Sequence, residues 1–129
     1  MIQVVCAVIL RDEKVLIAQR SEKMKLPLKW EFPGGKLKQG ENEKQAIIRE
    51  IKEELDIEIL PIKRISSNIH DYGLFNIKLI AYLCDYVSGE IKLLEHKDFK
   101  FLDFENLMDY DLAEADIPFI KNLKELLND

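Results

Sequence analysis

A chain of 129 residues, of which 47% are hydrophobic and 33% charged, has the size and composition of one globular domain with its own core. Its net charge of -5 argues against a general DNA- or RNA-binding protein, but not against a phosphorylated substrate whose charge a metal ion neutralises. The longest apolar run, VVCAVIL, is too short to cross a bilayer, and no secretory signal is visible, so we expect a cytoplasmic protein without a membrane partner. Cys6 and Cys84 lie in apolar runs without CxxC spacing, which favours two buried free thiols.

The first third of the chain predicts two strands and a long shaped loop. Strands are expected over 2–11 and 13–20, with a turn at 11–14, and a surface loop over 21–29. The segment 30–41, WEFPGGKLKQGE, contains Gly-Gly and a further glycine. This composition predicts a loop of defined shape rather than a regular element.

A helix is expected to begin after Asn42 and to end near Leu55 or Asp56. Asn42 is a favourable N-cap, and Gln45 three residues later completes a capping box. The apolar stripe of this helix is expected to consist of Ile47, Ile48, Ile51 and Leu55.

The second half of the chain is rich in strand patterns and ends in a helix. The expected elements are a strand over 57–67 bent at Pro61, strands over 75–87 and 99–104, a short helix over 105–112, and a helix over 117–127 with Asp116 as N-cap and Pro118 in its first turn. Strands with two main helices predict an α+β fold, in one domain over residues 1–129.

Three carboxylates crowd the central helix. Glu50, Glu53 and Glu54 are expected on one face, separate from the apolar stripe, where like charges repel each other. Arg49 can pair with Glu53 four residues later but cannot neutralise all three. Two interpretations remain open, a solvated acidic surface or a divalent cation such as Mg²⁺, which prefers carboxylate oxygens.

The loop before this helix favours the cation. In FPGGK the glycines allow close backbone approach, so the carbonyl oxygen of Gly34 is a candidate metal ligand. Lys36 offers a positive charge to a phosphate group. Loop and helix together would present oxygen ligands beside a phosphate contact.

These residues resemble the Nudix family. The segment 35–57 is similar to the Nudix box G-x5-E-x7-R-E-U-x-E-E-x-G-U, where U is a bulky apolar residue. The matching positions are Gly35, Glu41, Arg49, Glu50, Ile51, Glu53, Glu54 and Ile57. Asp56 replaces the second glycine of the box, and we expect it to tolerate a left-handed turn at a small cost in stability.

The resemblance extends to the MutT-like branch of the family. WEFPGGK before the box and EADIPFI near the C-terminus are similar to segments of that branch. The resemblance implies an α/β/α sandwich around a central mixed sheet. It also implies hydrolysis of a nucleoside triphosphate to the monophosphate and pyrophosphate, with Mg²⁺ as cofactor and Mn²⁺ as a substitute.

The resemblance also implies roles for individual residues. The metal ligands would be the Gly34 carbonyl with Glu50, Glu53, Glu54 and Glu95, the last of which matches the loop glutamate of the MutT-like pattern. Arg49 would orient a glutamate, and the general base would be Glu53 or Glu95. Glu41 would position the loop, bind a further metal, or complement the helix dipole.

Substrate contacts are expected outside the box. Arg20 and Lys36 are candidates for phosphate contact, although Arg20 would equally fit a surface cation. Asp116 would read the base or simply cap the last helix. The aromatic residues Phe32, Tyr72 and Phe75 would form a stacking surface or only pack. His96 is expected to be solvated, and His70, in a loop, to be a less favoured candidate for the substrate mouth.

Several functions remain open. The first is removal of an oxidised nucleotide such as 8-oxo-dGTP, and the second is hydrolysis of CTP or dCTP. A non-catalytic nucleotide-binding domain and an enzyme for nucleotide sugars or dinucleotides are less favoured, because all box glutamates are present and the chain is short. A monomer or weak homodimer without a nucleic-acid partner is expected.

Overall fold

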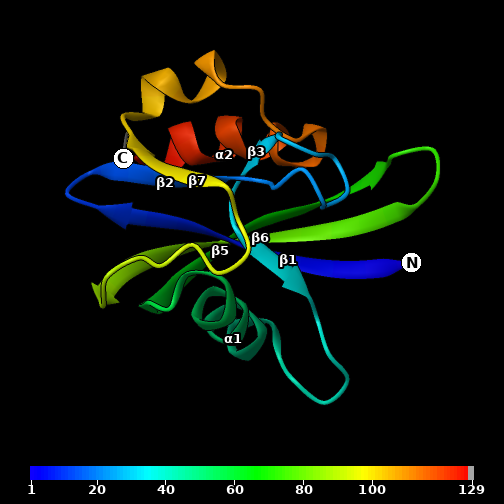
Figure 1. Cartoon of the computed structure of the whole chain (residues 1–129), viewed down its shortest axis with the longest axis horizontal. Coiled ribbons are helices and arrows are strands. Elements are labelled where there is room, and N and C mark those ends of the chain that lie inside the picture. The colour runs from blue at the N-terminus through cyan, green and yellow to red at the C-terminus, as the bar shows by residue number, and fades with distance from the viewer. Residues whose placement is uncertain (128–129) are drawn as a thin grey trace.

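The computed structural model describes residues 1–127, so the last two residues of the domain expected over 1–129 lie outside the described residues. A mixed sheet is covered by α1 on one face and by α2 with two short 3-10 segments on the other (Figure 1). The expected α+β class and α/β/α sandwich are therefore confirmed. The elements are β1 (Ile2–Arg11), β2 (Lys14–Gln19), β3 (Trp30–Glu31), β4 (Gly34–Lys36), α1 (Glu43–Leu55), β5 (Glu58–Asp71), β6 (Asn76–Ser88), β7 (Asp98–Leu102), η1 (Phe104–Asp109), η2 (Glu114–Asp116) and α2 (Pro118–Leu127).

Strand β1 is the centre of the sheet and its partners change along its length. One edge runs parallel to β6, from Ile2 to Leu10. On the other edge, β4 pairs antiparallel with the stretch from Val4 to Cys6, whereas β2 pairs only with Leu10 and Arg11. β2 then diverges from β1 and pairs with β3 and β7. The chain therefore passes from β3, which pairs with β2, to β4, which pairs with β1.

The side chains of β1 alternate between two cores. Val5, Ala7 and Ile9 pack in the core under α1, while Cys6 and Val8 pack in the core that includes the buried face of α2. This alternation follows from the two-residue period of a strand, and it explains the continuous apolar run VVCAVIL.

The predicted capping box begins α1. The Asn42 side chain accepts the Gln45 N–H at 2.8 Å, and the Gln45 side chain accepts the Asn42 N–H at 2.9 Å. Asp56 follows the helix with φ 57° and ψ 35°, the left-handed conformation expected there. Its backbone N–H donates to the Lys52 carbonyl. Local sequence signals therefore set both ends of α1.

The apolar stripe of α1 differs from the prediction at one position. Ile47, Ile51 and Leu55 are fully buried, but Ile48 is 37% exposed, so its assignment to the stripe is wrong. Ile48 lies at one edge of the stripe, and this edge faces away from the sheet. Ala46, on the opposite edge, is buried instead.

Strand pairing between distant segments makes the remaining elements differ from the predicted ones. The segment 30–41, expected as a loop, contributes two short strands because β2 and β1 supply hydrogen-bonding partners. β5 is irregular around Pro61 as expected, but it continues to Asp71 because β6 pairs with it throughout. The short helix expected over 105–112 is the 3-10 segment η1.

Both cysteines are buried free thiols, as predicted, and burial raises the pKa of Cys84 to about 12. Within residues 1–127, no helix is long and apolar enough to cross a membrane.

Candidate active site

Both glycines of β4 are closely packed, one against the main chain and one against a side chain. A Cβ atom on Gly34 would lie 1.9 Å from the Val5 carbonyl oxygen on β1. On Gly35 it would lie 2.3 Å from Oε2 of Glu50. Main-chain atoms block a Cβ at Gly34, so glycine there lets β4 join the sheet. At Gly35 the flexible end of the Glu50 side chain would have to move, so glycine there lets the Glu50 carboxylate lie against β4.

Arg49 organises the outer part of the acidic face. Its guanidinium contacts Glu41 through Nε at 3.0 Å and Nη2 at 2.6 Å, and it contacts Glu50 and Glu53 through Nη1 at 2.8 and 3.2 Å. Nη2 also donates to the Lys36 carbonyl at 3.1 Å. One arginine thereby ties the loop after β4 to the helix.

Glu41 is held by this network as an ionised loop residue. Hydrogen bonds from Arg49, and then from the Lys38 N–H, lower the pKa of Glu41 to about 2. Among the roles considered for Glu41, this geometry favours positioning of the loop.

The three box glutamates of the helix differ in environment. The Glu53 side chain is 51% exposed, that of Glu50 is 15% exposed, and that of Glu54 is 3% exposed. At 3.6 residues per turn, Glu54 lies about 20° around the helix from Ile47, inside the apolar stripe. The expected separate acidic face is therefore wrong for Glu54, and only Glu53 has the exposure of a solvated residue.

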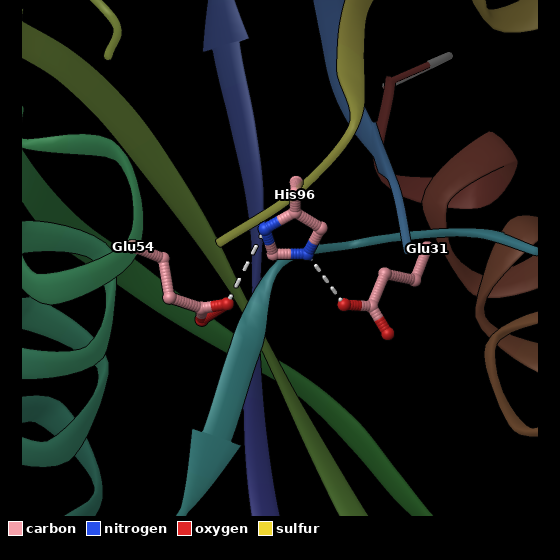
Figure 2. Close-up of side chains that lie close together, drawn as sticks. All are labelled: Glu31, Glu54 and His96. Carbon is pink, nitrogen blue, oxygen red and sulfur yellow. Dashed lines mark hydrogen bonds and ion pairs between the residues drawn. The ribbon is translucent and has the colours of Figure 1, made fainter. Parts of the chain in front are cut away.

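Glu54 faces a buried histidine. Figure 2 shows the His96 ring between Glu54 of α1 and Glu31 of β3. The His96 Nε2 lies 2.8 Å from Glu31 Oε2, and Nδ1 lies 3.6 Å from Glu54 Oε2. The His96 side chain is fully buried, so the prediction of a solvated histidine is wrong. Folding of the 89–97 connection against α1, through the Leu94 N–H and the Glu54 carbonyl, brings the ring inside.

The buried Glu54 carboxyl favours its neutral form when no cation is bound. Burial is the main reason that its pKa is raised to about 10, and the nearby charges of Glu31, Glu50 and Glu95 raise it further. Oε1 of Glu54 has no hydrogen-bond partner among the described residues. A buried carboxyl without a partner suits a divalent cation, because the charge of the cation would stabilise the ionised carboxylate.

A cavity of about 270 Å³ lies beside these carboxylates. Six candidates for substrate contact line it, namely Arg20, Phe32, Lys36, Tyr72, Phe75 and Asp116. Three of the expected metal ligands, Gly34, Glu54 and Glu95, also line it. Arg49, Glu50 and Glu53 are not among the described lining residues, and they lie on the adjoining helix face.

Asp116 lines the cavity and is 4% exposed. Its Oδ2 accepts the backbone N–H of Phe32 at 2.8 Å. Burial, and then the charge of Glu31, raise its pKa well above the usual range of an aspartate. The Asp116 carboxyl thus accepts from Phe32 and not from α2 among the described residues, so the alternative of an N-cap for the last helix is not favoured.

Tyr72 and Phe75 form an aromatic wall. Their rings stack with centroids 5.1 Å apart, and the Tyr72 hydroxyl accepts the Ala115 N–H at 2.8 Å. Lys25 from the 20–29 loop lies over the Phe75 ring at 4.7 Å. The aromatic wall is therefore fixed to both the Asp116 segment and the loop that follows β2.

Arg20 lines the cavity, its Nη1 contacts Glu31 Oε1 at 2.7 Å, and its side chain is 19% exposed. This geometry disfavours the alternative of a surface cation. His70 lies on β5 instead of in a loop, and its Nε2 is 3.1 Å from Glu114 Oε2. It is not among the described lining residues, so its candidacy for the substrate mouth is not supported.

Sequence reasoning missed Glu31 and its contact with His96. The available signal was the alternation in Trp-Glu-Phe, where Trp30 and Phe32 are buried in the same core and Glu31 points away from it. The alternation predicts which way Glu31 points only if the segment is known to be a strand.

Comparison with known proteins identifies the family. The family model for the NUDIX domain matches residues 1–123. The chain is 36% identical over 121 residues to a CTP pyrophosphohydrolase of Escherichia coli, covering 94% of this chain and 90% of that protein. It is 34% identical over 128 residues to a putative 8-oxo-dGTP diphosphatase 2 of Mycobacterium tuberculosis, covering 97% and 89%. The solution structure of the E. coli ORF135 protein superposes with a TM-score of 0.87 at 35% identity, covering 98% of this chain and 91% of that one.

Proposed function

The chain belongs to the Nudix hydrolase family, and we propose that it is a Mg²⁺-dependent nucleoside triphosphate pyrophosphohydrolase that releases a nucleoside monophosphate and pyrophosphate. The observation that carries this proposal is the meeting of three kinds of residue at one cavity. Acidic groups, basic groups and aromatic rings line it together. They suit, respectively, a metal ion, phosphates and a base.

The proposed metal ligands are the Gly34 carbonyl with Glu50, Glu53, Glu54 and Glu95, and Mn²⁺ would substitute for Mg²⁺. Among the described residues, the buried Oε1 of Glu54 has no hydrogen-bond partner, which supports the fit of a cation at this position. When bound, the ion supplies Lewis-acid activation of the phosphorus and neutralises developing charge.

The remaining chemistry belongs to side chains of this chain. Arg20 and Lys36 would hold the phosphate groups, and Arg49 would keep Glu50 and Glu53 in place. Glu53 or Glu95 would accept a proton from water while the water oxygen bonds to phosphorus and the bond to the pyrophosphate oxygen breaks. Glu95 lines the cavity, whereas Glu53 pairs with Arg49. Substituting each glutamate in turn would show which of the two is the general base.

We propose 8-oxo-dGTP as the first substrate, on the basis of the similarity to the diphosphatase from M. tuberculosis over nearly the whole chain. CTP or dCTP is the second candidate, on the basis of the similarity to the CTP pyrophosphohydrolase of E. coli. The buried Asp116, as a neutral carboxylic acid, donates one hydrogen bond and accepts another. This pattern complements the ring nitrogen and amino group of cytosine, and it equally complements the carbonyl oxygen and ring N–H of guanine.

A pyrophosphate-release assay with Mg²⁺ tests the proposal. It compares 8-oxo-dGTP, dGTP, CTP, dCTP and ADP-ribose, with Glu53→Gln as the inactive control. Preferential turnover of 8-oxo-dGTP supports a role in removing oxidised nucleotides, whereas preferential turnover of CTP or dCTP supports control of the pyrimidine pool. Turnover of ADP-ribose alone, absence of any turnover, or full activity of Glu53→Gln would overturn the proposed reaction.

A further inference from the structure

The contact between His96 and Glu54 lacks the geometry of a hydrogen bond. Nδ1 of His96 lies 3.6 Å from Oε2 of Glu54, beyond the usual range for nitrogen and oxygen. Within the described part of the chain, His96 Nδ1 and Glu54 Oε1 have no hydrogen-bond partner. The two side chains are 0% and 3% exposed. Buried polar atoms usually find a partner, so this pair requires an explanation.

The other ring nitrogen indicates how the imidazole is protonated. His96 Nε2 lies 2.8 Å from Oε2 of Glu31, which is itself held by Arg20 at 2.7 Å. A carboxylate accepts a proton donor, so the shared hydrogen belongs on Nε2. In the tautomer with its hydrogen on Nε2, the ring directs the Nδ1 lone pair toward Glu54 (Figure 2). Metal-binding histidines are commonly oriented in this way, with a carboxylate on the nitrogen that faces away from the metal.

We propose that His96 Nδ1 and Glu54 bind the same divalent transition-metal ion, so that His96 contributes a nitrogen ligand to the acidic metal centre. This inference rests on the metal requirement of the proposed function. Bonds from a metal to nitrogen and oxygen are about 2.0–2.2 Å long, so one ion can contact atoms up to about 4.2 Å apart. The observed separation of 3.6 Å lies within that reach.

The surroundings are consistent with this site. Glu54 and Glu95 line the cavity, which gives an ion a route from solvent. Glu31 contacts the opposite ring nitrogen, so it orients His96 and is not itself assigned as a ligand.

A purely structural role for the ring is less favoured, because the main chain already holds the connection that carries it. The Leu94 N–H donates to the Glu54 carbonyl at 3.1 Å, and the Lys97 N–H donates to the Gln19 carbonyl at 2.9 Å.

The nitrogen ligand predicts a particular metal preference. Carboxylates suit Mg²⁺ and Mn²⁺, whereas imidazole suits Zn²⁺ and the later transition metals. A site of carboxylates alone would discriminate less between Zn²⁺ and Mg²⁺ than one that includes His96.

The chain offers a clean test because it has only two histidines. Ring-nitrogen NMR during titration with Zn²⁺ should move the Nδ1 resonance of His96 and leave His70, on β5 beside Glu114, unchanged. The His70→Gln variant assigns the two signals and serves as the matched control. In parallel, His96→Gln retains an amide N–H for Glu31 but removes the nitrogen ligand. Calorimetry should show that its Zn²⁺-to-Mg²⁺ affinity ratio falls at least about tenfold.

Zn²⁺ binding that leaves the His96 resonances unmoved, or an unchanged affinity ratio in His96→Gln, would overturn the nitrogen ligand. The first measurement uses the unaltered protein, so it remains decisive if His96→Gln does not fold. Failure of Zn²⁺ to bind would also overturn it. Mg²⁺-supported pyrophosphate release by the unaltered protein reports separately on the proposed function.

Discussion

Replacing Gly35 by alanine tests whether the position of Glu50 matters for activity. The added Cβ would lie 2.3 Å from Glu50 Oε2, and relief to ordinary contact near 3.4 Å requires the carboxylate to retreat by about 1 Å. Gly35 is not among the residues with positive φ, so alanine fits the backbone itself. A misplacement of about 1 Å in an active site can cost about 100-fold, or about 2.7 kcal/mol of transition-state stabilisation.

Steady-state pyrophosphate release measures this loss, and urea unfolding measures its effect on the fold. We expect kcat/KM to fall about 100-fold in Gly35→Ala, while the free energy of unfolding falls by only about 1 kcal/mol through the weakened contact of Glu50 with Arg49.

Two further variants serve as controls for Gly35→Ala. In the double variant Gly35→Ala/Glu50→Asp, the shorter side chain avoids the added methyl group, so the losses of stability from the two single changes should not add. Gly40→Ala meets no atom within 4 Å, although its φ of 88° adds backbone strain, so it should lose stability without the large loss of activity. Full activity of Gly35→Ala would refute the reasoning that the glycine exists to place Glu50.

Three other perturbations have defined outcomes. Asn42→Ala removes half of the capping box and should lower the free energy of unfolding by about 1 kcal/mol in urea titration, whereas Asn42→Ser should retain most of it; equal losses would contradict the capping role. The pKa of Glu54 is about 10 in the metal-free folded protein and 4.5 in an unfolded chain. Between these pH values the folded protein therefore binds more protons than the unfolded chain. Its stability in EDTA should therefore fall as pH rises from 5.5 to 8.5, and Glu54→Gln should remove part of that fall; parallel pH curves for the two proteins would argue against it. Tyr72→Phe removes the acceptor of the Ala115 N–H beside Asp116, and should raise KM about fivefold with little change in kcat; a loss in kcat alone would place Tyr72 in the chemistry instead.

The features that sequence predicted best are those set by neighbouring residues. Asn42 and Gln45 form the predicted box because capping depends on a spacing of three residues. Asp56 adopts the expected left-handed conformation because the helix ends there. The Nudix box spans the end of β4, the following loop and α1, which are continuous in the chain, so its spacing alone indicates the family.

The features that sequence missed depend on contacts between distant segments. Glu31 and His96 are 65 positions apart, and they meet only because β2 pairs with both β3 and β7. The burial of Glu54 was accessible in principle, since its place on the helical wheel is close to that of Ile47. The cluster of three acidic residues suggested a shared surface, and tertiary packing separated them.

This separation divides the acidic residues of α1 into two electrostatic environments. Arg49 contacts Glu50 and Glu53, so the outer carboxylates have a cation within the protein. Glu54 faces an imidazole and other carboxylates, and the charge of Arg20 offsets their effect on its pKa only in part. A buried carboxyl without a sufficient countercharge remains neutral or binds a cation. The interpretation of the acidic cluster as a solvated surface therefore applies to Glu53, while Glu54 is the carboxyl at which a bound cation would most change the charge state of the site.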